Sequence, residues 1–285
     1  MEKHIESIHF PHVIHQTYKT TQLPPEWAQT PSSWKQQNPS FTYMFWTDKD
    51  IEVFTQRYFP QYVDMMRGFP YTIQRIDTVR YMWMYVYGGI YVDLDLQCMK
   101  PILPLLEFYE KVFPSTQVLL VMASNGLNSS SSHPDLTNAV LVSKPRAPFW
   151  LEVLKYIRAM TCELPWYKRI LKYSHVMYST GPGALSDVYA RLECGQKSHV
   201  QLIPHQFLSA CSMCDAKPCY NRLSFVRVVQ GSSWHNWEGG IIRYFYCVKR
   251  STWMWIIALT IMGLICLFLF HKIKLVQCER RCPRI

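Results

Sequence analysis

Two aspartates, Asp93 and Asp95, stand one residue apart after the apolar run Ile90-Tyr91-Val92. If the strand predicted for this run continues through them, their carboxylates point to the same side, because strand side chains alternate with period two. Two carboxylates this close repel each other unless a cation lies beside them. Hard oxygen ligands favour Mg²⁺ or Mn²⁺, which keep coordination positions free for phosphates. The pair therefore predicts a metal–diphosphate site, although a bare D-x-D is more often two solvated acids.

The residues before this pair predict a helix that ends directly at the strand. Between Tyr71 and Tyr87, apolar side chains recur every three or four residues, which is typical of a helix packed on one face. Gly88-Gly89 ends that helix, because glycine adopts the left-handed conformation of a helix cap without steric penalty. Asp77 and Arg80 lie three residues apart on this helix, close enough to form an ion pair.

Residues 10–245 alternate short apolar runs with helical patterns, which predicts one α/β domain after an N-terminal tail of residues 1–9. Strands are expected at residues 12–16, 41–46, 90–92, 118–122 and 200–203. Besides the helix at 71–87, helices are expected around Trp34, after the Thr47-Asp48 cap, and over residues 149–160. Residues 178–185 are predicted to be a loop that enters a helix.

Residues 253–270, WMWIIALTIMGLICLFLF, contain no charged side chain. As a helix this segment is about 27 Å long, close to the roughly 30 Å hydrocarbon core of a membrane. Tryptophans at one end and the basic tail 271–285 at the other suit the two interfaces. The sequence therefore predicts a single transmembrane helix, and a buried helix of a soluble core is the less favoured alternative.

The side of the membrane on which the main domain lies stays open. The basic tail favours a cytosolic C-terminus and a lumenal domain in the Golgi or the endoplasmic reticulum. Residues 1–17, however, contain no apolar signal segment. The alternatives are a tail-anchored chain with a cytosolic domain, lumenal entry by another route, and a truncated N-terminus.

The composition excludes a disordered chain and disfavours a nucleic-acid-binding one. Apolar residues make up 49% and charged residues 18% of the 285 residues, which is ample for a buried core. The formal charge of +10 comes from scattered basic residues without a basic arm or a recognised nucleic-acid-binding module. The cluster Cys211, Cys214 and Cys219 is compatible with a disulfide, a metal site or free thiols.

The block Ile76-Asp77-Thr78-Val79-Arg80-Tyr81, followed by Tyr87-Gly88-Gly89-Ile90-Tyr91-Val92-Asp93-Leu94-Asp95, closely resembles glycosyltransferases of family 32 with their DxD sugar-binding region. That family includes initiating Golgi mannosyltransferases of fungi and mannosyltransferases that act on inositol phosphoceramide. Further stretches agree in order over residues 10–240: Ile14-His15-Gln16, Trp34, Asn38-Pro39, Phe45-Trp46-Thr47-Asp48, Thr180-Gly181-Pro182-Gly183 and Ser233-Trp234-His235.

This resemblance implies a GT-A fold, a nucleotide-sugar-binding α/β sandwich with a mostly parallel sheet. It also implies a divalent metal, Mn²⁺ or Mg²⁺, and transfer of the sugar with retention of anomeric configuration. The relatives in fungi place a membrane segment before the catalytic domain, whereas the apolar run of this chain follows it.

The resemblance also implies roles for individual residues. Asp77 and Arg80 would hold hydroxyl groups of the donor sugar, while Asp93 and Asp95 bind the metal; these four are the expected catalytic residues. His235 would be a third metal or diphosphate contact. The expected remaining donor-site residues are Ile14, His15 and Gln16 at the nucleobase, Tyr91 in the donor pocket, and Gly181 and Gly183, whose backbone allows close approach on the acceptor side.

The sequence thus predicts a retaining hexosyltransferase that moves mannose from GDP-mannose to a membrane-associated acceptor such as inositol phosphoceramide. A UDP-sugar donor with a glycan or protein acceptor is the alternative within this class. A catalytically silent membrane scaffold and a metal-dependent phosphohydrolase are alternatives from other classes. Intact Asp77, Arg80, Asp93 and Asp95 argue against the scaffold, and the additional ligands of a phosphohydrolase are not evident.

Overall fold

The computed structural model divides into two units, Met1–Gly239 and Gly240–Ile285. In the first unit it describes residues 9–124, 133–209, 211 and 221–229, and in the second it describes residues 244, 247, 252, 255–257, 259–264 and 266. The described positions of the second unit are helical. All strands and helices named below belong to the first unit.

A six-stranded sheet runs through the first unit in the order β2-β1-β3-β6-β5-β7. Its strands are β1 (Val13–Thr17), β2 (Thr42–Trp46), β3 (Gly89–Val92), β5 (Val118–Met122), β6 (Leu136–Ser143) and β7 (Val200–Ile203). Pairs β1–β2, β1–β3 and β5–β7 are parallel, whereas β6 is antiparallel to both of its neighbours. The prediction of an α/β domain with a mostly parallel sheet is confirmed.

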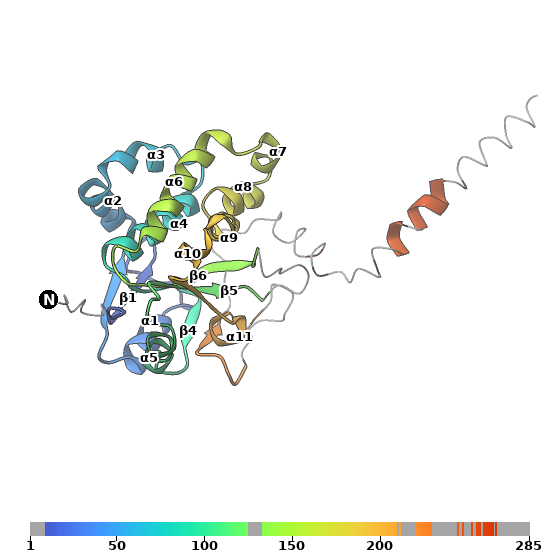
Figure 1. Cartoon of the computed structure of the whole chain (residues 1–285). Coiled ribbons are helices and arrows are strands. Elements are labelled where there is room, and N and C mark those ends of the chain that lie inside the picture. Colours follow the sequence, from blue (N-terminus) through green and yellow to red (C-terminus); the bar gives the residue numbers. More distant parts are fainter. Residues whose placement is uncertain are drawn as a thin grey trace, which may run out of the picture. The chain divides into compact units, whose positions relative to one another are not determined.

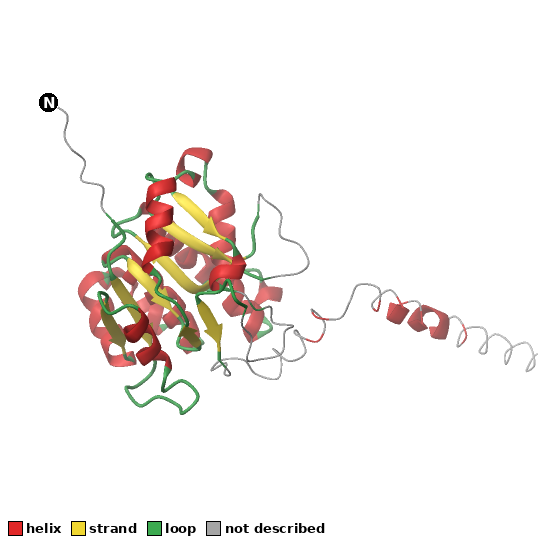
Figure 2. Cartoon of the chain, turned by 90° about the horizontal axis from the view of Figure 1, so that it is seen from below, coloured by secondary structure: helices red, strands yellow, loops and turns green. Residues whose placement is uncertain are grey.

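Helices cover both faces of this sheet (Figure 1), and Figure 2 shows its strands side by side between them. One face carries α2 (Asp48–Tyr58), α3 (Val63–Arg67), α4 (Thr72–Val86), α6 (Pro148–Glu163) and α9 (Pro182–Arg191), with α7 (Trp166–Arg169) and α8 (Lys172–Ser179) beside them. The other carries α1 (Thr30–Gln37), α5 (Leu103–Val112) and α11 (His205–Leu208). The 3₁₀ turn η1 (Pro60–Tyr62) and α10 (Cys194–Lys197) complete the helices.

Strand β3 joins the two cores on either side of the sheet. Tyr91 packs in the core under α4 and α6, whereas Ile90 and Val92 pack in the core under α1 and α5. All four residues of the strand are buried. A strand covered on both faces is expected to be apolar throughout, which is why Ile90-Tyr91-Val92 shows no polar alternation.

The Gly88-Gly89 turn connects α4 to β3 without a loop. Both glycines have positive φ angles, 64° at Gly88 and 82° at Gly89. A Cβ on Gly88 would lie 2.6 Å from the carbonyl oxygen of Ser143, and one on Gly89 would lie 2.4 Å from that of Val13. Only glycine allows the helix to end against two neighbouring strands at this distance.

A second, two-stranded sheet pairs β4 (Leu96–Cys98) with β8 (Val226–Val228) in antiparallel orientation. Helix α1 is hydrogen-bonded to β4. The indole Nε1 of Trp34 donates to the carbonyl of Leu96 over 2.7 Å, and the Ser33 hydroxyl accepts from the backbone of Cys98 over 3.0 Å. Trp34 is fully buried, and its hydrogen bond fixes the position of Leu96, the residue that follows Asp95.

The predicted strands at residues 12–16, 41–46, 118–122 and 200–203 are present within one residue. The predicted helices are also present, although α6 ends at Glu163, three residues later than predicted. The loop predicted at residues 178–185 is shorter, because α8 ends at Ser179 and α9 begins at Pro182. Thr47 caps α2 through a capping box with Asp50, as the Thr47-Asp48 pattern indicated. Strand β6 was not predicted, because Thr137, Asn138 and Ser143 interrupt its apolar pattern.

The predicted transmembrane helix at residues 253–270 is described at residues 255–257, 259–264 and 266. Those described within it, such as Trp255, Leu259 and Leu264, are helical and exposed. Within the described part of the chain, no helix is both long enough and apolar enough to cross a membrane.

Replacing Gly89 by alanine is expected to destabilise the first unit by about 2 kcal/mol or more, because the left-handed backbone and the contact with Val13 are both unfavourable for a Cβ. Gly195 in α10 is the matched control, since a Cβ there has no atom within 4 Å. Urea denaturation of Gly89→Ala and Gly195→Ala measures the difference. Equal stabilities of the two variants would contradict this account of the turn.

Candidate active site

The Asp93-Leu94-Asp95 motif lies in a turn rather than on a strand. Strand β3 ends at Val92, and the backbone N–H of Leu96 donates to the carbonyl of Asp93 over 3.1 Å to close a turn that leads into β4. The expectation that both carboxylates point to one side of a continuous strand was therefore wrong. The turn places the motif beyond the carboxyl end of β3, where the parallel strands β1 and β2 also end, and ligands of α/β sheets bind at such edges.

Arg80 on α4 is the centre of a buried charge cluster beside this turn. Its Nη1 lies 3.1 Å from Oδ1 of Asp93, and its Nη2 lies 3.3 Å from Oδ1 of Asp77. Nη1 also donates to the carbonyl of Asn138 on β6 over 2.8 Å. The side chain of Arg80 is only 3% exposed. One guanidinium thus joins α4 to the end of β3 and to β6.

Asp77 is held from three directions. Its Oδ1 accepts from Nδ2 of Asn138 over 2.9 Å in addition to the ion pair with Arg80, and its Oδ2 accepts from the Thr180 hydroxyl over 3.0 Å. Burial raises the pKa of the Asp77 carboxyl to about 6, although the charge of Arg80 and the hydrogen bond from Thr180 lower it. The helix ion pair between Asp77 and Arg80 is therefore present, and their contact with a sugar stays a prediction.

Tyr91 orients Asp93. Its hydroxyl donates to Oδ1 of Asp93 over 2.7 Å, and its ring lies under the Arg80 guanidinium with 4.5 Å between the guanidinium carbon and the ring centroid. Tyr91 is 1% exposed. The Tyr91 side chain therefore contacts both Asp93 and Arg80 of the charge cluster. Its predicted place in the lining of a donor pocket stays a prediction.

Only one oxygen of the Asp93 carboxylate, Oδ1, contacts other described side chains. Oδ1 accepts a hydrogen bond from the Tyr91 hydroxyl and pairs with Arg80, whereas Oδ2 has no hydrogen-bond partner within the described residues. The side chain is 31% exposed. Two carboxylates share the one guanidinium of Arg80, so with both ionised the three groups carry one net negative charge, which a cation beside them would offset.

The donor set at the turn fits a divalent metal ion in its chemistry. Asp93 offers a free carboxylate oxygen, and Asp95 is half-buried two residues on, with its carbonyl accepting from the backbone of Val229 over 2.9 Å. Hard oxygen ligands of this kind suit Mn²⁺ or Mg²⁺. In the described ranges, no group of three or more His, Cys, Asp or Glu side chains surrounds one point. The predicted third ligand, His235, lies outside the described residues.

The three residues predicted at the nucleobase are buried at the end of β1. Ile14 packs in the core under α1 and α5. His15 accepts from the Trp46 indole at Nδ1 over 3.1 Å, so Nε2 carries the proton and donates to the Gly88 carbonyl over 3.0 Å. Gln16 donates to the Asp93 carbonyl over 3.3 Å and accepts from the Tyr43 hydroxyl over 2.7 Å. These contacts hold β1, β2 and the motif together, and contact with a base stays a prediction.

Gly181 and Gly183 lie where α8 meets α9. Gly181 is the N-cap of α9, and a Cβ on Gly183 would lie 2.8 Å from the carbonyl oxygen of Met177. The close backbone approach expected of these glycines is thus an approach between two helices. Thr180, which lies between α8 and α9, is within hydrogen-bonding distance of Asp77. Their contact with an acceptor or donor stays a prediction.

Asn138 and Tyr81 belong to the site but were not predicted from the sequence. Nδ2 of Asn138 donates to Asp77 and also to the Tyr81 hydroxyl over 3.1 Å, and that hydroxyl donates to the carbonyl of Thr180 over 2.9 Å. The only signal was an amide side chain within the apolar stretch Leu136–Ser143, which is buried in the structure. A buried polar residue in a strand needs partners, but the sequence does not name them.

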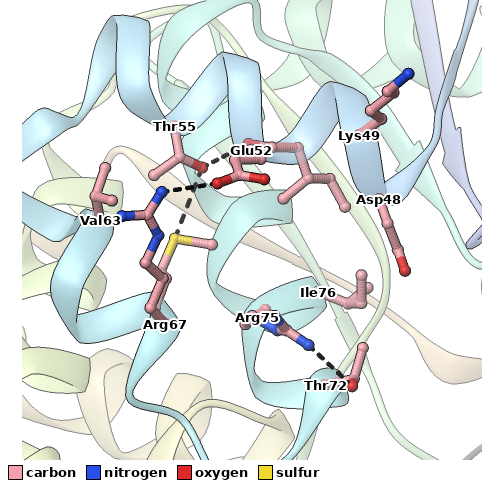
Figure 3. A pocket seen from close by; sticks show the side chains of 11 residues that line it. Asp48, Lys49, Glu52, Thr55, Val63, Arg67, Thr72, Arg75 and Ile76 are labelled. Atoms are coloured by element: carbon pink, nitrogen blue, oxygen red, sulfur yellow. Dashed lines mark hydrogen bonds and ion pairs between the residues drawn. The ribbon is translucent and has the colours of Figure 1, made fainter.

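A pocket of about 310 Å³ lies between α2, α3 and the first turns of α4. Figure 3 shows Glu52 and Thr55 of α2 facing Thr72 and Arg75 of α4. Ile76, which also lines the pocket, immediately precedes Asp77. At its other end Asp48 begins α2, and its backbone N–H donates to the carbonyl of Lys19, just after β1. The residues that line the pocket are thus sequence neighbours of Asp77 and of the end of β2.

Cys211 forms a disulfide bond in the structure, as does Cys247. Of the three readings of the cysteine cluster, a disulfide therefore applies to Cys211. Cys214 and Cys219 lie outside the described residues.

Removing Arg80 is expected to cost about 3–5 kcal/mol of unfolding free energy, because Asp77 and its partners would keep a buried charge without a cation. Arg67, which pairs with Glu52 at 2.8 Å with both side chains more than half exposed, is the control and is expected to cost less than about 1 kcal/mol. Urea denaturation of Arg80→Ala, Arg80→Lys and Arg67→Ala tests this. A loss for Arg80→Ala no greater than that for Arg67→Ala would show that the cluster is not a structural centre.

His15 makes stability depend on pH. Burial lowers the pKa of the His15 imidazole to about 4, whereas the unfolded chain takes up that proton near 6.5. The unfolded state therefore binds more protons as the pH falls from 6.5 to 4, and stability decreases over that range. We expect the native chain to lose about 3 kcal/mol more than His15→Gln between pH 7 and pH 4. The comparison cancels the opposite effect of the raised pKa of Asp77, and equal losses would contradict the buried neutral imidazole.

Comparison with known proteins assigns the segment around the Asp93-Leu94-Asp95 motif to a family. Residues 24–119 match the family model of the glycosyltransferase sugar-binding region containing a DXD motif. The chain is 30% identical over 236 residues to mannosyl phosphorylinositol ceramide synthase CSH1 of Saccharomyces cerevisiae, covering 82% of this chain and 55% of that protein. It is 28% identical over 242 residues to inositol phosphoceramide mannosyltransferase 3 of Schizosaccharomyces pombe, covering 84% and 60%.

The chain thus spans little more than half the length of these two relatives. Among solved structures, that of the PaToxG glycosyltransferase covers 63% of this chain and 68% of its own, with 13% identity and a TM-score of 0.40. The segment that contains α4, the Gly88-Gly89 turn and Asp93-Leu94-Asp95 therefore belongs to the family of glycosyltransferase sugar-binding regions with a DXD motif.

Proposed function

We propose that this chain is a metal-dependent retaining glycosyltransferase that moves a hexose, mannose from GDP-mannose being favoured, to a membrane-associated acceptor such as inositol phosphoceramide. The observation that carries the proposal is the Arg80 cluster. It holds Asp77 and Asp93 together at the strand ends, inside a region that matches DXD sugar-binding sequences.

Asp77 and Arg80 are the proposed contacts to the donor sugar. Nη2 of Arg80 carries two hydrogens and has one partner, Asp77, within the described residues. The other hydrogen is available for a sugar hydroxyl. Asn138, Thr180 and Tyr91 fix the positions of Asp77 and Asp93, so these groups need little rearrangement when the donor binds.

Asp93 and Asp95 are the proposed metal ligands, with His235 as a third. Val229 is hydrogen-bonded to Asp95, and the six residues from there to His235 can span about 20 Å, enough to return to the motif. A bound Mn²⁺ or Mg²⁺ would neutralise the diphosphate leaving group. The acidic pair supports this assignment, since Tyr91 and Arg80 both contact Oδ1 of Asp93 and Oδ2 has no hydrogen-bond partner among the described residues.

We infer that transfer proceeds on one face of the sugar without a covalent enzyme intermediate. Both oxygens of Asp77 accept hydrogen bonds, and Oδ1 also pairs with Arg80, which makes this carboxylate a poor nucleophile. Oδ1 of Asp93 is similarly committed. Trapping a glycosyl group on Asp77 would contradict this inference.

The pocket beside α4 is the proposed site for the nucleotide end of the donor. It borders Ile76, next to the sugar contact Asp77, and contains both carboxylates and basic groups. Guanine presents two neighbouring N–H donors to a carboxylate such as Asp48, and two acceptors to a basic side chain such as Arg75. Uracil offers a single N–H donor, so a carboxylate in this pocket supports GDP over UDP as the proposed donor. The fully buried side chains of His15 and Gln16 leave the pocket as the better candidate.

A lipid acceptor and a lumenal location are proposed from three observations. The two relatives are named for inositol phosphoceramide or its mannosylated product. The uncharged run at residues 253–270 is long enough in sequence to serve as a membrane anchor. Disulfide bonding of Cys211 and Cys247 fits an oxidising compartment such as the lumen of the secretory pathway.

The proposal is tested by donor turnover. We expect the full chain with Mn²⁺ to release nucleotide from GDP-mannose faster than from UDP-hexoses, and Asp95→Ala to reduce that rate about a hundredfold or more, because the leaving diphosphate loses its metal. Asp64 on α3, an exposed acid outside the pocket lining, is the control, and Asp64→Ala should retain full activity.

No release from any donor would favour the silent-scaffold alternative. Release that is faster with a UDP-sugar would favour the alternative donor. Release that Asp95→Ala leaves unchanged would exclude the site. A melting temperature of Asp95→Ala close to that of the native chain shows that lost activity is not lost folding.

A further inference from the structure

The segment that connects α6 to α8 exposes an unusual concentration of apolar side chains. Eleven large apolar side chains are exposed among the described residues of the first unit, and five of them lie within thirteen positions. They are Trp166 (75% exposed), Tyr167 (58%), Ile170 (65%), Leu171 (38%) and Tyr178 (38%). Single exposed apolar residues are ordinary, but a contiguous group marks a contact surface.

Basic residues are interleaved with these side chains. Lys168, Arg169 and Lys172 lie among them, and residues 164–180 contain no acidic residue. The ammonium of Lys168 lies 3.7 Å from the centroid of the Tyr178 ring, so apolar and charged groups share one surface. We call the five apolar residues and these three cations the α7–α8 surface.

Contacts between α8 and α4 link this surface to the charge cluster of the site. Figure 1 shows α7 and α8 beside α6, on the side of the sheet that also carries α4. The His175 ring packs edge-on against Tyr71, the N-cap of α4, at 5.6 Å, and Gln74 of α4 donates to the Ser179 hydroxyl over 2.8 Å. Thr180, which follows α8, donates to Asp77.

We propose that the α7–α8 surface rests in the headgroup layer of a bilayer that contains anionic phospholipids. Trp and Tyr prefer the membrane interface, where an apolar ring and a polar group are both satisfied, and Ile170 and Leu171 reach the acyl boundary. Lys168, Arg169 and Lys172 give this surface positive charge that attracts lipid phosphates. The Arg169 guanidinium also donates to the carbonyls of Leu164 and Cys162, and Lys168 and Lys172 lie over the rings of Tyr178 and Tyr71. A protein partner of mixed charge lacks that complementarity.

The consequence is that the bilayer orients the site. Helix α8 from Lys172 to Ser179 is about 12 Å long, so Asp77 lies within about one short helix of the lipid headgroups. A lipid acceptor need not leave the membrane to reach it. This consequence rests on the proposed transfer to a membrane-associated acceptor, whereas binding of the surface to lipid does not.

Hydrogen–deuterium exchange of the full chain measures the contact locally, without interference from other membrane-binding segments. We expect amides of residues 164–173 to exchange about tenfold more slowly with vesicles of phosphatidylcholine and phosphatidylinositol than without vesicles. Lys168→Gln/Lys172→Gln should remove most of that protection, and so should Trp166→Ala/Ile170→Ala. Raising the salt concentration should weaken it, because screening acts on the charged contacts.

Phe108→Ala is the matched control, because Phe108 is an aromatic residue of similar exposure (54%) on α5, on the opposite face of the sheet. It should leave the protection of residues 164–173 unchanged. Unchanged exchange in the presence of anionic vesicles would overturn the proposal. Protection that needs no vesicles and grows with protein concentration would also overturn it and identify contact between chains.

These outcomes are separate from those of the donor assay. The exchange measurement needs no turnover, so a chain that binds vesicles through this surface but releases no nucleotide would disprove the proposed reaction alone. Nucleotide release that continues in Trp166→Ala/Ile170→Ala shows that the variant is folded.

Discussion

The arrangement of this protein depends on one buried guanidinium. Arg80 pairs with Asp77 on its own helix, with Asp93 beyond β3, and with the backbone of β6. A buried cation is stable only when its hydrogen bonds are met, and the three elements that supply them must keep a fixed distance. The cluster therefore helps to position the DXD turn, together with the backbone hydrogen bonds of Asp93 to Ala139 and of Asp95 to Val229.

The Gly88-Gly89 turn makes this cluster possible within one short segment. Asp77 and Arg80 come from α4, and Tyr91 and Asp93 come from the strand that follows immediately. Positive φ angles at both glycines let the helix reverse into the sheet between Val13 and Ser143. His15 secures the same corner by donating to the Gly88 carbonyl, which explains a fully buried histidine whose pKa is depressed.

Helix α4 also links the three regions to which we assign binding. Its first turns line the pocket through Thr72, Arg75 and Ile76, and its middle carries Asp77 and Arg80. Its N-cap, Tyr71, contacts α8 beside the exposed α7–α8 surface. A nucleotide, a sugar and a lipid headgroup would thus each meet the same helix. Movement of α4 would therefore change all three regions together.

Much of the fold could be predicted from the sequence because its signals are local. Periodic apolar residues over Tyr71–Tyr87, the glycine pair and the run Ile90–Val92 are properties of neighbouring residues, and so is the capping box at Thr47. The same segment carries the DXD motif, so the sequence by itself determined the residues at the centre of the candidate site and the family model that they match.

Only the tertiary structure decided how that centre is assembled. Asn138 and Thr180 reach Asp77 across 61 and 103 residues, and such contacts follow from sheet order and helix packing, which no local pattern encodes. The same holds for the burial of His15 and Gln16, for the antiparallel strand β6 within an otherwise parallel sheet, and for the turn that replaces a continuous strand at Asp93-Leu94-Asp95. Side-chain type determines which chemistry is available, but the three-dimensional packing of distant segments determines which groups are close enough to share a charge.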